Sequence, residues 1–282
     1  MVSNLERRLT RTRRMFAPGK RSLLTDRTAS PYHWADRVPH ADALGDPITS
    51  ETSMIVLGID TATPGLGVAL AGPEGLIAEA MVGTGLRHAQ GLLPAVEWLL
   101  GTSEMSVQDL GAVAVTLGPG SFTAVRIGLN TAKGLCMGRN LPLVGISSLA
   151  AAAARHPQCA WPVVPWFDAK RKEVYAGRYD TSGPYPRALE PDDVIAPDLW
   201  LARHPGPALF VGDGAVLYRD LITSRLGDKA HLTPAWEPLA SAGVVAVWGR
   251  ERAIRGEVLD PDQAAPVYLR RPQALLTQSH AR

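Results

Sequence analysis

Residues 118–135 read Gly-Pro-Gly-Ser-Phe-Thr-Ala-Val-Arg-Ile-Gly-Leu-Asn-Thr-Ala-Lys-Gly-Leu, a glycine-rich turn that opens an amphipathic helix. The apolar run at 112–117 predicts a buried strand before the turn, and Ser121 is a favourable N-cap for the helix. From Phe122 onward, apolar residues recur at helical spacing with small residues between them, which allows another helix to approach closely. The stretch therefore predicts a strand, a tight turn and a helix over 121–137.

The same turn has a second interpretation, because free N–H groups at a helix N-terminus attract anions. A P-loop places its lysine directly after the second glycine of the motif, whereas Lys133 lies inside the predicted helix. We therefore favour a packing face over a phosphate site, and both interpretations stay open at this point.

Composition predicts a two-lobed globular protein without a nucleic-acid footprint. The chain has 282 residues, of which 46% are hydrophobic, enough for a sizeable core. Nine of the 29 Lys and Arg and six of the 27 Asp and Glu lie in residues 1–53, which leaves 20 against 21 for residues 54–282. The larger part is nearly neutral and so lacks the broad basic surface typical of a nucleic-acid binder.

Two cysteines, Cys136 and Cys159, are too few for a disulfide framework and lack metal-ligand spacing. The sequence also has no apolar run of transmembrane length. We therefore expect a cytoplasmic protein with no membrane partner and no metal.

Residues 1–53 differ from the rest, with clustered arginines and no apolar periodicity. We expect this extension to be disordered. It reads as a transit-like leader, as a basic arm that touches RNA, or as an overlong gene start with the true start at Met54. We favour the last of these.

From Met54 onward, the periodicity predicts an α/β protein with an N-terminal lobe over 54–155 and a C-terminal lobe over 156–282, each with a mixed sheet. The predicted strands are 55–59, 67–71, 78–82, 112–117, 143–146, 163–167, 173–179 and 209–212. The predicted helices are 88–100, 121–137, 148–154, 215–226 and 240–254, the last expected to pack back on the first lobe. The proline-rich stretch 183–207 is expected to wrap the surface.

Six short motifs follow one another in a characteristic order. They are Ile-Asp-Thr-Ala-Thr at 59–63, the glycine-rich turn at 118–128, Leu-Val-Gly-Ile-Ser-Ser-Leu at 143–149, Asp-Ala-Lys-Arg-Lys-Glu-Val-Tyr at 168–175, Gly-Asp-Gly-Ala at 212–215 and Pro-Val-Tyr-Leu-Arg at 266–270. As an ordered set, they make residues 54–275 resemble the TsaB (YeaZ) family. The resemblance implies an actin-like ATPase (ASKHA) fold of two α/β lobes.

The resemblance further implies a scaffold subunit rather than an enzyme. Members of this family form a heterodimer with TsaD, joined by the ATPase TsaE, and TsaD transfers a threonylcarbamoyl group onto N6 of adenosine 37 in tRNAs that read codons starting with A. The subunit itself is implied to be catalytically silent, to meet tRNA only indirectly and to have no cofactor of its own. A homodimer through the same helices, and ATP or ADP at the complex interface, are left open.

The histidines support a silent subunit. The catalytic relative carries two histidines four residues apart, which face one way on a helix and hold a metal. Here the matching helix starts at His88, and position 92 is leucine. A lone histidine at a helix start is more often a hydrogen-bonded cap or a surface residue.

Asp60 stands where actin-like ATPases place the acid of the first phosphate loop, and Thr61 and Thr63 would supply hydroxyls beside it. Asp213 fits a second nucleotide loop. The other interpretation is structural, since Asp, Thr and Asp-Gly sequences close turns by hydrogen bonds to the backbone. We favour the structural interpretation and keep Asp60, Thr61, Thr63 and Asp213 as candidate nucleotide ligands.

The resemblance assigns the TsaD interface to helices 88–100 and 121–137. Its predicted contact residues are His88, Leu92, Val96, Leu99, Ser121, Phe122, Val125, Arg126, Leu129 and Ala132. Ala124 stands where members of the family commonly have glycine, and its methyl group is expected to loosen the close approach of the partner helix. Arg126 reads as a salt link or, more commonly, as an ordinary solvated charge.

Two other functions compete with the scaffold. One is an active ATP-hydrolysing or sugar-kinase-like enzyme that uses Asp60 and Asp213. The other is a glycoprotease, for which the sequence offers no Ser-His-Asp set, His-Glu-x-x-His motif or reactive cysteine pattern.

Overall fold

The computed structural model describes residues 53–83, 88–237 and 239–269, which all belong to one compact unit, Tyr32–Arg282. Its strands are β1 (Ile55–Asp60), β2 (Gly65–Gly72), β3 (Gly75–Gly83), β4 (Leu110–Thr116), β5 (Leu143–Ile146), β6 (Val163–Asp168), β7 (Val174–Ala176), β8 (Tyr179–Asp180), β9 (Arg187–Ala188), β10 (Asp193–Ile195), β11 (Ala208–Val211) and β12 (Ala230–Leu232). Its α-helices are α1 (His88–Thr102), α2 (Phe122–Arg139), α3 (Ser148–Ala154), α4 (Pro197–Arg203), α5 (Asp213–Leu217), α6 (Arg219–Leu226) and α7 (Ala242–Ile254), and short 3₁₀ turns cover Val107–Asp109 and Gly227–Lys229.

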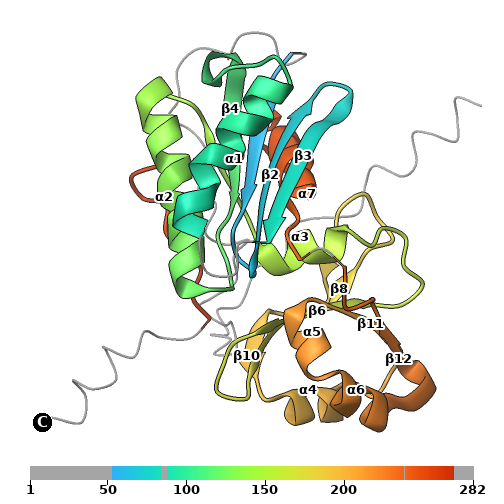
Figure 1. Cartoon of the computed structure of the whole chain (residues 1–282). Coiled ribbons are helices and arrows are strands. Elements are labelled where there is room, and N and C mark those ends of the chain that lie inside the picture. Colours follow the sequence, from blue (N-terminus) through green and yellow to red (C-terminus); the bar gives the residue numbers. More distant parts are fainter. Residues whose placement is uncertain (1–52, 84–87, 238, 270–282) are drawn as a thin grey trace, which may run out of the picture. The chain divides into compact units, whose positions relative to one another are not determined.

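The first sheet has the order β3-β2-β1-β4-β5. β1, β2 and β3 run antiparallel as a meander, while β1, β4 and β5 are parallel. Helices α1 and α2 cover one face of this sheet and α7 covers the other (Figure 1). The sheet is therefore mixed and is enclosed by helices on both faces.

Side chains of β1 point alternately to the two faces of the first sheet, one covered by α1 and α2 and the other by α7. Leu57 and Ile59 are buried in one core cluster with the apolar stripes of α1 and α2, and Val56 belongs to a second cluster with α7 residues. Gly58 lies on the α7 side, where a Cβ atom would come within 2.6 Å of the Ala242 carbonyl oxygen. Glycine at this position therefore allows α7 to pack directly on the sheet.

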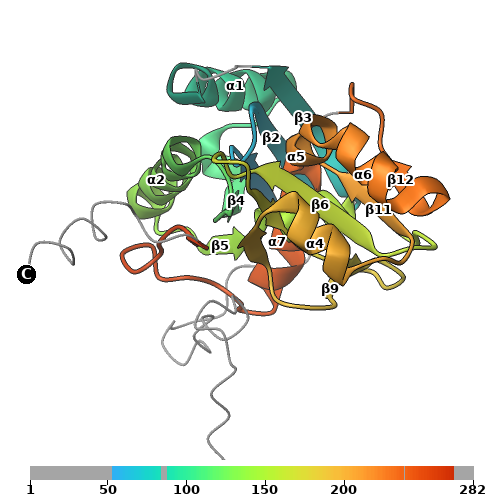
Figure 2. The same cartoon turned by 90° about the horizontal axis from the view of Figure 1, so that it is seen from below.

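The second sheet has the order β10-β7-β6-β11-β12, and β8 pairs with β6 and β9. Figure 2 shows β6 and β11 with α4, α5 and α6 beside them. Three large aromatic side chains meet edge to face in this core: Trp166, Trp200 and Phe210. Their ring pairs make this sheet's core distinct from the aliphatic core under α1 and α2.

Helix α3 lies between the cores of the two sheets. Its alanines are buried in one cluster with Ala114 of the first sheet and Val163 and Val211 of the second. The Ser147 side chain caps the helix by accepting from the Ala150 N–H at 3.3 Å. Small alanine side chains let both sheets approach this short helix.

Most predicted elements agree with the structure to within two residues at each end, but two are divided. The predicted strand 173–179 is interrupted between β7 and β8. Pro165 of β6 lies opposite the interruption, accepts from the Gly177 N–H at 3.2 Å and has no N–H to donate in return. The predicted helix 215–226 is likewise divided at Tyr218, whose φ of −106° and ψ of 22° leave the helical region.

The stretch 183–207, for which the sequence predicted only a course over the surface, also has regular structure. It contains β9, β10 and α4, and Pro197 starts α4 at a position where a missing N–H costs nothing. The three-residue strand β12 was also missed, because so short a run has no readable period. The expectations for residues 1–52 lie outside the described residues.

After α7 the chain runs back along the first sheet as a segment that we call the C-terminal strap (257–269). The Leu259 N–H donates to the Leu143 carbonyl at 2.7 Å and the Val267 N–H donates to the Leu117 carbonyl at 2.8 Å. The strap therefore follows the β5 edge of the sheet.

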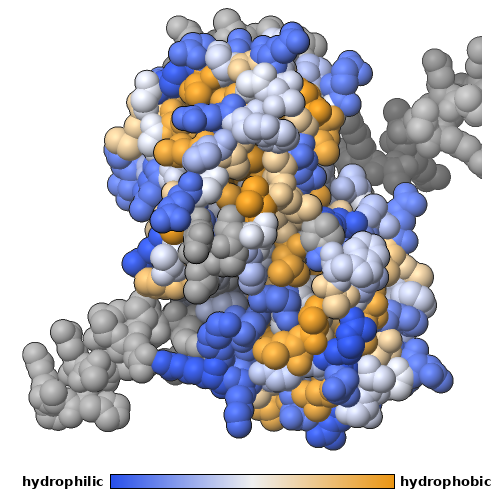
Figure 3. Space-filling view, viewed as in Figure 1, coloured by the Kyte–Doolittle hydropathy of each residue, from blue (hydrophilic) through white to orange (hydrophobic). Residues whose placement is uncertain are grey.

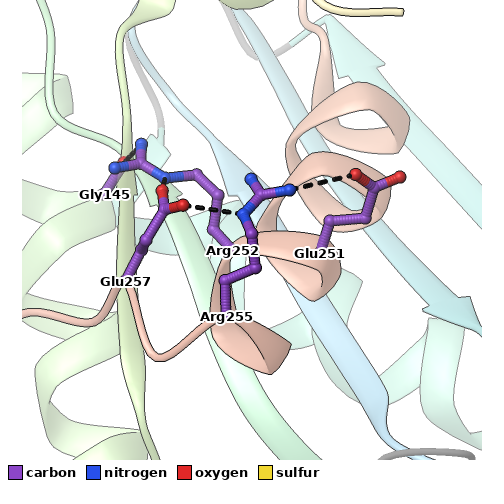
Figure 4. A network of polar contacts seen from close by, with 5 residues as sticks. All are labelled: Gly145, Glu251, Arg252, Arg255 and Glu257. Atoms are coloured by element: carbon purple, nitrogen blue, oxygen red, sulfur yellow. Dashed lines mark hydrogen bonds and ion pairs between the residues drawn. The ribbon is translucent and has the colours of Figure 1, made fainter. Parts of the chain in front are cut away.

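An ion-pair network anchors the start of the strap to α7 (Figure 4). Glu257 lies between two guanidinium groups and accepts from Arg252 Nε at 2.9 Å and from Arg255 Nε at 2.7 Å. Arg252 also donates through Nη1 to the Gly145 carbonyl of β5 at 2.8 Å. The network thus joins α7, the strap and the edge of the sheet.

Within the described ranges, no helix combines the length and the apolar character that crossing a bilayer requires.

Candidate functional site

Asp60, at the carboxyl end of β1, is the centre of the candidate nucleotide site. Its side chain is 2% exposed and accepts from the Ala62 N–H at 3.0 Å, the Thr116 hydroxyl at 2.9 Å and the Ser241 N–H at 2.7 Å. Burial raises the pKa of this carboxyl above its usual value, and the hydrogen bonds from Ala62, Ser241 and Thr116 offset part of that effect. Both carboxylate oxygens thus already have partners within the chain.

The two neighbouring threonines are also used inside the protein. The Thr61 hydroxyl donates to the Ala124 carbonyl of α2 at 2.7 Å, and the Thr63 hydroxyl lies 3.5 Å from the Gly65 carbonyl. The Thr63 carbonyl lies 3.0 Å from Nε2 of His88 at the start of α1. The β1–β2 turn therefore holds the N-terminal ends of both α1 and α2.

The glycine-rich turn packs against that same turn. A Cβ atom at Gly120 would lie 2.2 Å from the Ala62 carbonyl oxygen, and one at Gly128 would lie 2.3 Å from the Thr61 hydroxyl. The Ser121 N–H donates to the Ala62 carbonyl at 2.9 Å. These contacts support the packing interpretation of residues 118–128. Ser121 stands at the N-cap of α2, as predicted, and its side chain makes no capping hydrogen bond.

Asp213, the other candidate nucleotide ligand, begins α5. Its Oδ1 accepts from the Asp168 N–H at 3.3 Å, and burial raises its pKa, with the nearby Asp168 carboxylate adding to the effect. Lys170 pairs with Asp168 at 2.6 Å. The Asp213 carboxylate thus joins the first turn of α5 to the carboxyl end of β6. Its role is structural, but Asp213 and Gly214 lie in a helix and not in the Asp-Gly turn that the sequence suggested.

A small cavity lies next to Gly212, the residue before Asp213. Its lining residues are Ala152, Arg155, His156, Phe167, Val211, Gly212, Val216, Thr233, Pro234, Glu237 and Leu239. Glu237 lies 3.2 Å from His156 Nε2 and 3.9 Å from Arg155. Burial acts to raise the pKa of Glu237, but hydrogen bonds from His156 and Thr233 lower it overall. Neither Asp60 nor Asp213 lines this cavity, so the structure does not bring the two predicted ligands together in it.

The part of the chain that the structure describes contains no group of three or more His, Cys, Asp or Glu side chains suited to a metal ion. His88 is 3% exposed and hydrogen-bonded to Thr63, so it is neither a surface residue nor near a second histidine on α1.

The predicted partner contacts need a correction, because most of them are buried within this chain. His88, Leu92, Val96, Leu99, Val125, Leu129 and Ala132 are each at most 3% exposed. The leucines, Val96 and Ala132 belong to the core between α1, α2 and the first sheet. The apolar stripe of each helix therefore packs on the protein's own sheet, and only Ser121, Phe122 and Arg126 of the predicted set are exposed.

Four large apolar side chains of α1 and α2 are exposed, and of these only Phe122 was among the predicted contacts. The exposed fractions are 50% for Leu93, 60% for Trp98, 45% for Phe122 and 65% for Met137. We call these four residues the outer helix face. Figure 3 shows hydrophobic surface over the part of the molecule that carries these helices. These exposed residues could have been found in the sequence as apolar residues that fall outside the helical spacing of the buried stripe. Leu93, directly after Leu92, is an example.

Small residues accompany the outer helix face. A Cβ atom added at Gly101 of α1, or at Gly134 or Gly138 of α2, would meet no atom within 4 Å. The backbone of each helix is therefore open to close approach from outside at these points.

Arg126 is exposed, as an ordinary solvated charge would be, but its side chain also has partners within the chain. Its Nε donates to the Tyr268 hydroxyl of the C-terminal strap at 2.7 Å, and its guanidinium lies 3.9 Å from the centre of the Phe122 ring. The Phe122 and Tyr268 rings stack with centroids 5.0 Å apart. The strap thus ends on the first turns of α2, next to the outer helix face.

Comparisons with known proteins agree with this geometry. The family model described as TsaD, tRNA N6-adenosine threonylcarbamoyltransferase, matches residues 84–281. The tRNA threonylcarbamoyladenosine biosynthesis protein TsaB of Bacillus subtilis is 33% identical, with 78% of this chain and 96% of that protein covered. The TsaB protein of Escherichia coli is 34% identical, with 77% and 95% covered.

Among solved structures, YeaZ from Pseudomonas aeruginosa aligns with a TM-score of 0.66 at 28% identity over 77% of this chain and all of that one. Together with the mixed sheets, this likeness confirms the predicted α/β class of actin-like fold. The chain therefore belongs to the TsaB (YeaZ) family of tRNA threonylcarbamoyladenosine biosynthesis proteins.

Proposed function

We propose that this protein is a non-catalytic subunit that a TsaD-type transferase requires to place threonylcarbamoyl groups on N6 of adenosine 37 in tRNA. The relatives' names place them in the biosynthesis of the modified nucleoside, and the matching family model is named for the transferase. In this proposal TsaD is the direct partner, TsaE joins the pair, and tRNA is met through the complex in the cytoplasm.

The outer helix face carries the proposal. Leu93, Trp98, Phe122 and Met137 are 45% to 65% exposed on neighbouring helices, and large exposed apolar side chains of this kind commonly mark a protein interface. Trp98 is the natural anchor, since tryptophan is enriched among residues that dominate binding energy. Open glycines on the same helices suit close contact with helices of a partner.

The candidate nucleotide residues support a silent subunit. Asp60 already accepts three hydrogen bonds from within the chain, and Thr61 donates to α2. A hydrated magnesium ion at Asp60 would have to displace at least one of these partners. We therefore propose no nucleotide at Asp60, and place any ATP or ADP of the complex at the subunit interface.

The test is a reconstituted transfer assay with the TsaD and TsaE proteins of the same organism, with and without this chain. We expect tRNA modification only when the chain is present. Leu93→Asp and Trp98→Asp should each abolish TsaD binding and modification, because a carboxylate would be buried at the interface. Trp236→Asp is the matched control, since Trp236 is 81% exposed on a loop away from α1 and α2.

Two results would overturn the proposal. One is full modification without the chain, and the other is ATP turnover by the chain alone that Asp213→Asn removes. The second result would favour the ATP-hydrolysing or kinase-like alternative.

A further inference from the structure

The turn between β6 and β7 has a left-handed backbone, and we call its residues 169–173 the basic turn. The φ angles are 61° at Lys170, 57° at Arg171 and 63° at Lys172. Residues other than glycine rarely adopt this conformation, because the Cβ atom comes too close to a carbonyl oxygen. Elsewhere among the described residues, a non-glycine residue with positive φ occurs only singly, at Glu104, Asn140 and Gln158. Three such residues in a row set the basic turn apart.

Hydrogen bonds within and beside the basic turn hold this backbone in place. The Ala169 N–H donates to the Glu173 carbonyl at 3.0 Å, and the Glu173 N–H donates to the Lys170 carbonyl at 3.0 Å. Asp168 Oδ1 accepts from the Lys170 N–H at 2.8 Å, and the Asp168 N–H donates to Asp213 at 3.3 Å. A strained backbone persists only where its surroundings fix it. The basic turn is therefore a rigid element at the carboxyl end of β6.

The residue types of the basic turn are not those that a left-handed turn favours. Glycine adopts positive φ at little cost, and asparagine tolerates it better than most residues. The chain does have glycine at other positive-φ positions, such as Gly118 and Gly256. In the basic turn it has three long basic side chains instead, and all three are exposed. A turn that only reversed the chain would not need them, so the strain points to a function of these side chains.

The cations and the acids of this region differ in exposure. The Lys170 side chain is 81% exposed, whereas its ion-pair partner Asp168 is 16% exposed. The two other acids next to the turn, Glu173 and Asp213, are also only partly exposed. A molecule that approaches from solvent therefore meets the cations first.

We propose that the basic turn contacts the phosphate backbone of the tRNA that the complex modifies. Lysine and arginine bind phosphate oxygens irrespective of base sequence, and a rigid turn loses little conformational entropy on binding. One turn supplies few contacts, so the turn adds to the affinity of the complex and does not bind tRNA tightly alone. The nearly neutral charge of residues 54–282 agrees with such a local contact. This inference rests on the function proposed above, which brings tRNA to the chain.

Arg171→Gly and Lys172→Gly separate the side chains from the backbone strain. Each variant removes a cation and also relieves the left-handed strain, so it should raise the urea midpoint of unfolding. In the complex with TsaD, the double variant should bind labelled tRNA roughly 10-fold more weakly by fluorescence anisotropy. The slope of log affinity against log salt should fall by about 2, one for each lost phosphate contact. Higher stability with weaker tRNA binding is a combination that a purely structural turn does not give.

Two variants serve as controls. Lys172→Arg keeps the cation and should keep the tRNA affinity. Lys229→Gly removes an exposed cation directly before β12. Because β12 and β11 are parallel, as are β11 and β6, Lys229 lies at the opposite end of the second sheet from the basic turn. Lys229→Gly should therefore leave the tRNA affinity unchanged, and calorimetry should show wild-type TsaD binding for every variant.

Two results would overturn the proposal while the proposed function stands. One is unchanged tRNA affinity of the double variant in a complex whose wild type modifies tRNA. The other is an equal loss of affinity in Lys229→Gly, which would reflect net charge and not the basic turn. Loss of TsaD or TsaE binding with unchanged tRNA affinity would place an acidic protein surface on the turn instead. If the wild-type complex neither binds nor modifies tRNA, the proposed function fails and this contact fails with it.

Discussion

At the residue scale, Asp60 is a buried carboxylate that joins three separate parts of the chain. It accepts from the β1–β2 turn, from Thr116 at the end of β4, and from Ser241 at the start of α7. All three partners are donors of the protein itself. Hydrogen bonds to a charged acceptor are stronger than neutral ones, and leaving a buried donor without a partner is costly.

Asp60→Asn should destabilise the fold. The amide oxygen can still accept from Thr116 or Ala62, but the amide nitrogen would then face the Ser241 N–H, and two donors would oppose each other. We expect the free energy of unfolding to fall by about 2 kcal/mol, measured by urea denaturation. Glu74→Gln, at an exposed position in the β2–β3 turn, should change it by less than about 0.5 kcal/mol. Equal stability of Asp60→Asn and wild type would contradict a structural role for Asp60.

At the element scale, two glycines of α2 have opposite surroundings. A Cβ atom at Gly128 would come within 2.3 Å of the Thr61 hydroxyl, whereas one at Gly134 would meet nothing within 4 Å. Glycine inside a helix costs stability relative to alanine because its backbone loses more entropy on folding. Gly128 is therefore explained by packing, whereas no neighbour among the described residues explains Gly134.

Replacing each glycine by alanine should change stability in opposite directions. Gly134→Ala should raise the free energy of unfolding by about 0.5 to 1 kcal/mol through helix propensity. Gly128→Ala should lower it by roughly 1 to 3 kcal/mol, because the added methyl group has to displace Thr61. Thermal and urea denaturation would measure the change in free energy of unfolding of each variant relative to wild type. Each variant is the control for the other. A gain for both would mean that Thr61 does not pack on α2 as described.

The C-terminal strap depends on Glu257, and this dependence should vary with pH. Burial acts to raise the pKa of Glu257, but hydrogen bonds from Arg255 and Arg252 lower it overall below 4.5. A lowered pKa means that the unfolded chain binds the proton more readily. The stabilisation is therefore present above about pH 4.5 and is lost as the pH falls through the lowered value.

Glu257→Gln should cost about 1 kcal/mol at pH 7, a modest amount because 38% of the Glu257 side chain is exposed and water screens the pair. The difference in free energy of unfolding between Glu257→Gln and wild type should shrink as the pH is lowered from 5 to 3. Urea denaturation at each pH would measure this difference. Asp262→Asn, at an exposed position in the same strap, is the control. A difference that stays constant over this range would show that the charge of Glu257 is not what stabilises the strap.

At the scale of the whole molecule, helices α1 and α2 have an inner face that packs on the first sheet and an outer face that is exposed. Their inner stripes hold the first sheet together, and their outer face exposes Leu93, Trp98, Phe122 and Met137. The same two helices therefore stabilise the fold and leave large apolar side chains exposed.

Gly134→Ala provides a test in which stability and binding separate. If a partner helix approaches α2 at Gly134, the added methyl group should weaken TsaD binding about 10-fold even though it stabilises the free subunit. Isothermal titration calorimetry with TsaD would measure this, with Gly206→Ala on an open loop as the control. Unchanged affinity would place the partner away from this part of α2.

The predictions from sequence succeeded where a local pattern was sufficient. The alternation in β1 and the helical period after Phe122 located strands and helices, because each pattern reports which residues of an element are apolar. The division of 173–179 opposite Pro165 and the non-helical Tyr218 were missed, since both depend on neighbours distant in sequence or on one backbone conformation.

The candidate interface also shows that a local pattern does not reveal which distant segment an element contacts. Periodicity identified Leu92, Val96 and Leu129 as apolar stripes, and the prediction assigned them to a partner. The structure assigns them to the protein's own sheet. A sequence reports that a face is apolar, but the surface that covers it depends on how the remaining elements fold around it.

The sequence by itself determined the family, through six motifs in order, and the succession of strands, glycine turns and helices, because these depend on residues close together in the chain. Only the tertiary structure decided that Asp60 binds Ser241 across 181 positions, that Arg126 meets Tyr268 of the strap, and that β3 is the outermost strand of the first sheet among the described residues. These three outcomes depend on which distant segments meet, and local chemistry does not specify that.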